Sequence, residues 1–169
     1  MANIVPGCQL RIEILKSKIT RMDGKKALPD ERILQKAYEK RSADSEWRKN
    51  LAVFLIDDKG KEIVEADFNR EQLEKRTGTH AEMVVLRSIQ DKYPGATILQ
   101  VYTERYPCGK EWADCERNLT GTHNVAGSPR LSPSQIFYVV HAKLCKINEA
   151  EKIANFVAEA YGVQILRKA

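Results

Sequence analysis

The side chains in this chain that are best suited to chemistry are one histidine, one glutamate and two cysteines. His80 and Glu82 stand in the stretch "THAEM", and Cys108 and Cys115 bound the stretch "CGKEWADC". One imidazole and two thiolates can hold a zinc ion and leave its fourth position for water. Zinc lowers the pKa of bound water towards neutrality, which makes hydroxide available as a nucleophile. We therefore expect His80, Cys108 and Cys115 to bind Zn²⁺ and Glu82 to move protons beside it.

The elements around these residues are expected to bring them together. Residues 80–92 carry apolar side chains on one helical face and end at Tyr93-Pro94-Gly95, so that His80 and Glu82 open a helix. Residues 96–103 form a buried strand, and the polar stretch 104–134 that follows holds both cysteines and a short helix near 115–119. In a βαβ arrangement the starts of successive helices lie above the carboxyl ends of the strands, where sites of open sheets form.

The remaining pattern predicts an α/β fold: a three-layer α/β/α domain with a five-stranded mixed sheet and a helix between the last two strands. Because a helix separates those two strands, they can run parallel through a right-handed crossover. The other expected elements are a helix over 29–49, a hairpin of strands 51–58 and 62–68, a strand over 134–142, a helix over 148–162 and a last strand over 163–167.

The chain has 169 residues, enough for one domain with a substantial core. Residues 29–169 are expected to form the domain that carries the site. Residues 1–28 are an N-terminal extension of uncertain structure, in which "IEIL" fits a strand or part of a helix.

Composition narrows the classes of function. The apolar share of 43% and charged share of 30% are typical of a soluble globular protein. No apolar run approaches the roughly 18 residues of a membrane span, and the first residues lack the pattern of a signal peptide. We expect a cytoplasmic site of action and no membrane partner. The formal charge of +5 mildly favours a polyanionic partner such as nucleic acid, although a solvated basic surface explains it equally well.

His-Ala-Glu, followed by Pro-Cys and a second cysteine, resembles the zinc signature of the cytidine deaminase-like superfamily, H-x-E…P-C-x-x-C. The element order over residues 30–167 is similar to that superfamily's fold. The helix before the last strand resembles the division that holds tRNA adenosine, dCMP and APOBEC-type deaminases. The resemblance implies that Glu82 is catalytic and not a ligand, that Asn69 contacts the substrate sugar, and that the backbone N–H of Ala81 binds the base carbonyl.

The spacing of the cysteines departs from that signature, because it is C-x6-C and not C-x2-C. On a continuous helix the two Cα atoms would lie about 10 Å apart, too far for both thiolates to reach one ion. We infer that residues 109–113 loop out, that Asp114 caps a helix and that Cys115 lies in its first turn. Such wide spacings, and "YTERYPC", resemble the deaminase domains of bacterial polymorphic toxins.

Three further residues are candidates for substrate contact. Trp112 in the expected loop could stack on a base, or equally cover an edge of the short helix. Tyr106 and Arg105 precede the first cysteine and could pack against the target base and bind a phosphate.

The other histidines and cysteines are weaker candidates for the site. His141 fits a core or rim position, His123 lies in a polar loop, and Cys8 and Cys145 fit ordinary thiols. His-x-Glu alone also occurs by chance, and His80 could simply cap a helix.

The sequence thus predicts an enzyme: a zinc-dependent hydrolytic deaminase that converts cytosine to uracil in nucleic acid, with single-stranded DNA favoured and RNA or double-stranded DNA as other targets. A toxin domain would also need an immunity protein as its partner. Alternatives are a deaminase of a free nucleoside, nucleotide or purine base, and a catalytically silent nucleic-acid-binding or zinc-stabilised interaction domain.

Overall fold

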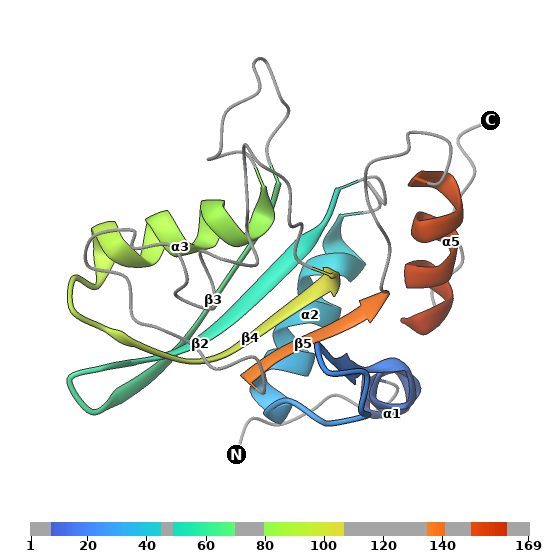
Figure 1. Cartoon of the computed structure of the whole chain (residues 1–169), viewed down its shortest axis with the longest axis horizontal. Coiled ribbons are helices and arrows are strands. Elements are labelled where there is room, and N and C mark those ends of the chain that lie inside the picture. Colours follow the sequence, from blue (N-terminus) through green and yellow to red (C-terminus); the bar gives the residue numbers. More distant parts are fainter. Residues whose placement is uncertain (1–7, 45–48, 70–79, 107–134, 141–149, 162–169) are drawn as a thin grey trace.

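A five-stranded mixed sheet lies at the centre of the computed structural model, with the strand order β1-β5-β4-β2-β3 (Figure 1). The structure describes residues 8–44, 49–69, 80–106, 135–140 and 150–161. The strands are β1 (Thr20–Arg21), β2 (Leu51–Asp58), β3 (Lys61–Phe68), β4 (Thr97–Arg105) and β5 (Ile136–Val140). The helices are α1 (Cys8–Lys18), α2 (Glu31–Ala43), α3 (Ala81–Lys92) and α5 (Ala150–Ala160).

The sheet combines antiparallel and parallel pairs. β2 pairs antiparallel with both β3 and β4, whereas β4 and β5 run parallel. The β2–β3 hairpin turns at Lys59 and Gly60, which both have positive φ, of 55° and 86°. This is the backbone of a type I′ turn, whose twist suits a two-residue hairpin. The predicted hairpin and mixed sheet are therefore confirmed.

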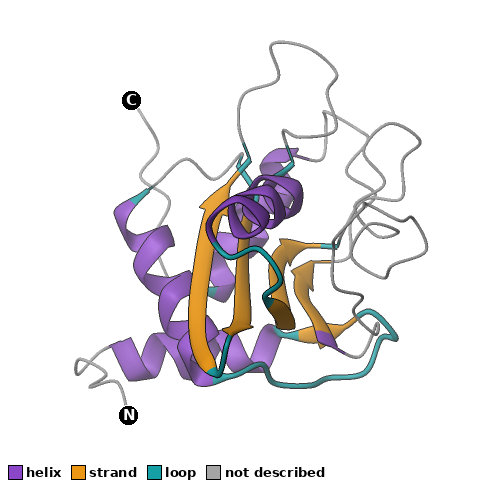
Figure 2. Ribbon diagram, turned by 90° about the vertical axis from the view of Figure 1, so that its left-hand side faces the viewer, coloured by secondary structure: helices purple, strands orange, loops and turns teal. Residues whose placement is uncertain are grey.

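Helices cover the sheet on both faces (Figures 1 and 2). Along β2, Ala52, Phe54 and Ile56 pack against α3, and the alternate residues Leu51, Val53 and Leu55 face the other way. The second set shares a core with α1, α2 and α5, to which Ile12, Ile33 and Val157 contribute. The predicted three-layer α/β class is confirmed.

The N-terminal part of the chain contributes to this same core. Residues 8–18 form α1, in which Ile12 and Leu15 are fully buried. β1 pairs antiparallel with β5, so that Thr20 lies opposite Tyr138. The fifth strand described therefore comes from residues that the sequence pattern left open. The predicted strand over 163–167 and the short helix near 115–119 lie outside the described residues.

Two predicted boundaries were wrong. The helix expected over 29–49 spans residues 31–43, and Asp30 caps it by accepting a hydrogen bond from the backbone N–H of Arg32. β4 does not end at Thr103 but continues through Glu104 and Arg105, which are both buried. The sequence suggested a polar loop there, but Glu104 is paired with Arg41 inside the protein and so remains part of the strand. None of the helices among the described residues is long and apolar enough to cross a bilayer.

Candidate active site

Glu82 lies in the first turn of α3 and is buried, with 3% of its surface exposed. Its Oε1 atom accepts a hydrogen bond of 3.0 Å from the Thr103 hydroxyl and one of 3.2 Å from Asn50 Nδ2. Thr103 lies near the end of β4, and Asn50 immediately precedes β2. Because β2 and β4 are antiparallel, the start of one meets the end of the other, and α3 begins beside both. The His-x-Glu carboxylate thus lies at the end of the sheet where β4 finishes and β2 begins.

Asn50 joins these three elements through its side-chain amide. Its Oδ1 accepts a hydrogen bond of 3.1 Å from the backbone N–H of Arg105, and its Nδ2 donates to Thr103 Oγ1 at 2.8 Å and to Glu82. Since a backbone N–H can only donate, the Arg105 contact assigns oxygen and nitrogen of this amide. The amide of Asn50 therefore presents its NH₂ group to Glu82.

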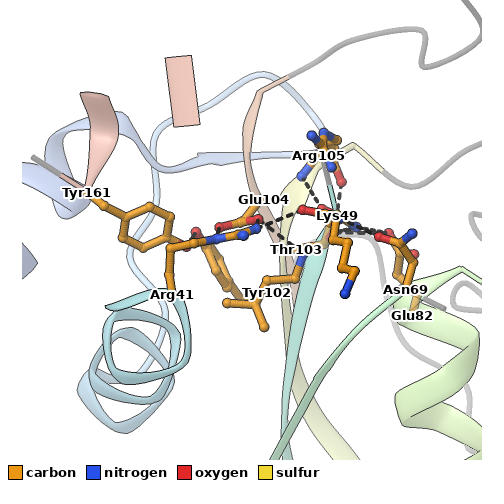
Figure 3. Close-up of polar contacts among 11 residues, drawn as sticks. Arg41, Lys49, Asn69, Glu82, Tyr102, Thr103, Glu104, Arg105 and Tyr161 are labelled. Atoms are coloured by element: carbon orange, nitrogen blue, oxygen red, sulfur yellow. Dashed lines mark hydrogen bonds and ion pairs between the residues drawn. The ribbon is translucent and has the colours of Figure 1, made fainter. Parts of the chain in front are cut away.

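Asn69 follows the end of β3 and is hydrogen-bonded to Asn50. Its Oδ1 accepts a hydrogen bond of 2.5 Å from the backbone N–H of Asn50, and its own N–H donates to the Asn50 carbonyl at 3.2 Å. The two asparagines thereby close the open end of the β2–β3 ladder. Figure 3 shows Asn69 and Glu82 on the same side of the end of β4.

His80 occupies the N-cap position of α3, two residues before Glu82, and is half-buried. Its backbone carbonyl accepts the first helical hydrogen bond, of 2.9 Å from Val84, but its side chain makes no capping hydrogen bond. The structure therefore does not support the alternative in which the imidazole is a helix cap. An imidazole is among the commonest zinc ligands.

Cys108, Cys115 and Trp112 lie outside the described residues, as do His123, His141 and Cys145. Within the described part of the chain, no group of three or more histidine, cysteine, aspartate or glutamate side chains could hold a metal ion.

Three other predicted substrate residues, Ala81, Arg105 and Tyr106, lie within the described part of the chain. Ala81 is fully buried in the first turn of α3, and Tyr106 packs edge-on against Tyr138 with ring centroids 5.1 Å apart. Arg105 is 3% exposed, so a phosphate could reach its guanidinium only if that group became more accessible. Burial holds the pKa of Arg105 below its ordinary value, against the opposing influence of the Glu104 and Glu82 carboxylates.

Behind this site lies a second buried polar group that the sequence did not reveal. Side chains alternate along β4, so that Thr103 and Arg105 lie on the side of Glu82 whereas Tyr102 and Glu104 face α2 (Figure 3). Glu104 forms an ion pair with Arg41 of α2, and each side chain is 1% exposed. Tyr102 and Tyr161 share a buried hydrogen bond between their hydroxyls.

Asn50 and Thr103 were not among the predicted site residues. The signal for Thr103 was weak: three polar residues, Thr-Glu-Arg, directly follow the apolar residues of β4. Asn50 is a single polar residue before an apolar run, which fits a loop equally well. Only the pairing of β2 with β4 brings both residues to Glu82.

The comparisons with known proteins point to one family. A family model described as Xanthomonas-like deaminase matches residues 48–142, more than half of the 169 residues. The matched segment includes Asn50, Asn69, Glu82 and the expected zinc ligands. No curated protein and no solved structure matches the chain. Because the match covers more than half of the chain and includes the buried Glu82 of the His-x-Glu motif, the chain belongs to the Xanthomonas-like deaminase family.

Proposed function

We propose that this deaminase-family domain is a zinc-dependent enzyme of the cytidine deaminase-like superfamily that hydrolyses cytosine to uracil in nucleic acid. The observation that carries the proposal is the position of Glu82. Its carboxylate is buried at the first turn of α3 and held at the end of β4, in the segment that matches the deaminase family. A general acid–base group in such an enzyme needs this shielding and fixed geometry.

The residues available fit a zinc ion. His80, Cys108 and Cys115 would hold the ion, since one imidazole and two thiolates form a common catalytic zinc set with an open position. When bound, zinc would supply a water molecule of lowered pKa as the nucleophile. The half-buried position of His80, at the start of α3 and two residues before Glu82, agrees with this role.

The chain's own residues then handle the protons. Glu82 takes a proton from the attacking water as the C–O bond forms at the amidine carbon of the base. The C–N bond breaks, and Glu82 delivers the proton to the departing amine, which leaves as ammonia. The backbone N–H of Cys108 is proposed to stabilise the developing charge on oxygen, and that of Ala81 to bind the base carbonyl.

Single-stranded DNA is the proposed substrate because a base must be unstacked before it can enter a closed pocket. The net charge of +5 favours a polyanion. Asn69 is proposed to contact the sugar, Tyr106 and Trp112 the bases, and Arg105 a phosphate. RNA and double-stranded DNA remain alternative targets, and an immunity protein is the proposed partner if the domain acts as a toxin.

The test is a panel of substrates incubated with purified, zinc-loaded protein and read by mass spectrometry. We expect a cytosine-containing single-stranded oligonucleotide to gain about one mass unit per deaminated base, because an amino group is exchanged for oxygen. Free cytidine, an adenine oligonucleotide, and the matching RNA and duplex define the substrate class. Activity on the monomer alone would refute the nucleic-acid target and favour the alternative, an enzyme of nucleosides or nucleotides.

A silent binding or interaction domain makes a different prediction. In that case the zinc-loaded protein would bind the oligonucleotide, or unfold on chelation, without releasing ammonia from any base. Glu82→Gln would then leave oligonucleotide binding unchanged, because no step would use the carboxylate for proton transfer.

A further inference from the structure

We propose that Asn50 and Thr103 are positioning residues that hold the carboxylate of Glu82 in its working orientation, an inference that rests on the proposed function. The terminal torsion of a glutamate is broad, so that a carboxylate without donors rotates over a wide range. Here two donors reach the same oxygen, Oε1, at 3.0 and 3.2 Å from two different strand ends. The plane of the carboxylate is thereby fixed relative to β2 and β4.

Asn50 is itself held on four sides. Its side-chain oxygen accepts from the N–H of Arg105, its NH₂ group donates to Thr103 and Glu82, and its backbone N–H and C=O both pair with Asn69. Turning this amide would point its NH₂ group at the Arg105 N–H and set donor against donor. The residue is 7% exposed, so water could not readily replace the lost partners. Asn50 is therefore a rigid support for Glu82.

Thr103 supplies the shorter of the two contacts. Its hydroxyl accepts from Asn50 Nδ2 at 2.8 Å and donates to Glu82 at 3.0 Å, with the Arg105 carbonyl at 2.9 Å as a second acceptor of the same proton. The Arg105 carbonyl restricts the rotation of the Thr103 side chain about its Cα–Cβ bond. Thr103 is fully buried and its hydroxyl hydrogen-bonds to protein groups, which fits a role of support.

The proposal predicts that rate falls while substrate affinity is kept. A proton-transfer carboxylate that is displaced slightly loses rate steeply, and partners that orient a first group are worth about 10–100-fold in activity. Thr103→Val keeps the volume and removes the hydroxyl, so we expect kcat to fall about 10–100-fold with KM nearly unchanged. Thr103→Ser restores the hydroxyl and should recover most of the lost rate.

The experiment measures kcat and KM on the substrate that the wild-type protein deaminates fastest. Thr103→Val and Thr103→Ser are compared with Thr97→Val, the same change at the exposed first residue of β4. Asn50→Asp keeps the acceptor for Arg105 but turns the donor into an acceptor facing Glu82, and should lower kcat at least as much. Circular dichroism and zinc content confirm that each variant is folded and loaded. If Thr103→Val retained the kcat of wild type, the positioning role would be disproved while the proposed function stood.

A second readout does not depend on activity. The side-chain NH₂ of Asn50 gives its own pair of signals in an ¹⁵N-labelled sample, and Glu82→Gln removes the charge of its acceptor. We expect those signals to move in Glu82→Gln and in Thr103→Val, and to stay in place in Thr97→Val. If the signals moved in neither variant, the hydrogen bonds of Asn50 with Glu82 and Thr103 would be disproved. Absence of deamination by wild type on any substrate would instead refute the proposed function.

Discussion

Arg41 of α2 and Glu104 of β4 form an ion pair that is almost completely buried, directly behind the residues that hold Glu82. Arg41 Nε donates to Glu104 Oε2 at 3.0 Å, and Glu104 Oε1 accepts from the backbone N–H of Leu51 at 3.1 Å. Arg41 also donates to the Lys49 carbonyl at 2.8 Å and lies 4.8 Å from the ring centroid of Phe68. The pair thus ties α2 to the start of β2 and the end of β4.

Removing one partner of this pair should destabilise the fold strongly. Arg41→Met leaves the Glu104 carboxylate buried without its counter-charge, for which we expect a loss of about 3–5 kcal/mol in the free energy of unfolding. Denaturant unfolding at neutral pH measures this. The double variant Arg41→Met/Glu104→Gln should be less destabilised than the two single changes together, because they share one interaction.

The matched control lies on the same helix. Arg32 also pairs with carboxylates, those of Asp30 and Glu62, but its side chain is 43% exposed. Arg32→Met should therefore change the free energy of unfolding by no more than about 1 kcal/mol. Equal losses for Arg41→Met and Arg32→Met would show that burial does not govern the strength of these pairs.

The buried pair also shows where the sequence could not predict the structure. Arg41 and Glu104 lie far apart in the chain, and a charged residue beyond an apolar run is typical of a loop. The pattern placed strands 51–58 and 62–68 correctly because alternation and a turn are local signals. Nothing local indicates which distant residue neutralises Glu104, and so β4 was expected to end at Thr103.

Some residues of the candidate site could be predicted from local sequence signals, and others could not. The His-x-Glu motif at the start of a predicted helix identified His80 and Glu82, and both lie at the start of α3. Asn50 and Thr103 became part of the site only through the antiparallel pairing of β2 with β4. Since their polarity is equally typical of loops and strand edges, the pattern alone could not select them.

Two buried tyrosines should make the fold sensitive to alkaline pH. Burial, together with the nearby charge of Glu104, raises the pKa of Tyr102 and Tyr161 well above the ordinary value. The unfolded chain, whose tyrosines ionise near pH 10, then binds fewer protons than the folded one above that pH. The stability that these two groups contribute is complete below about pH 10 and is lost as pH rises further.

The measurement follows tyrosinate absorbance and far-ultraviolet circular dichroism together during an alkaline titration. Of the six tyrosines, Tyr102 and Tyr161 should ionise only as the helical signal disappears. In Tyr102→Phe/Tyr161→Phe the absorbance change that coincides with unfolding should shrink. Ionisation of all six tyrosines in protein that still gives the native dichroism spectrum would contradict the expected burial.

Zinc content tests the proposed ligands. The wild-type protein should bind one Zn²⁺ per chain, and His80→Ala, Cys108→Ser and Cys115→Ser should each lower its affinity for zinc by at least about 10–100-fold, because each removes a direct ligand. Metal analysis after dialysis against a weak chelator measures this. Cys8→Ser and Cys145→Ser are the matched controls and should retain the metal. Equal zinc content in all five variants would refute this set of ligands.

The most direct test of the central claim is ammonia release from a cytosine-containing single-stranded oligonucleotide by wild type and Glu82→Gln at equal zinc content. Glutamine keeps the shape of the side chain but cannot accept the proton of the attacking water. We expect wild type to convert cytosine to uracil and Glu82→Gln to be slower by about 10²–10⁴-fold or more, the range for loss of general acid–base catalysis. Equal rates for the two proteins would contradict the account.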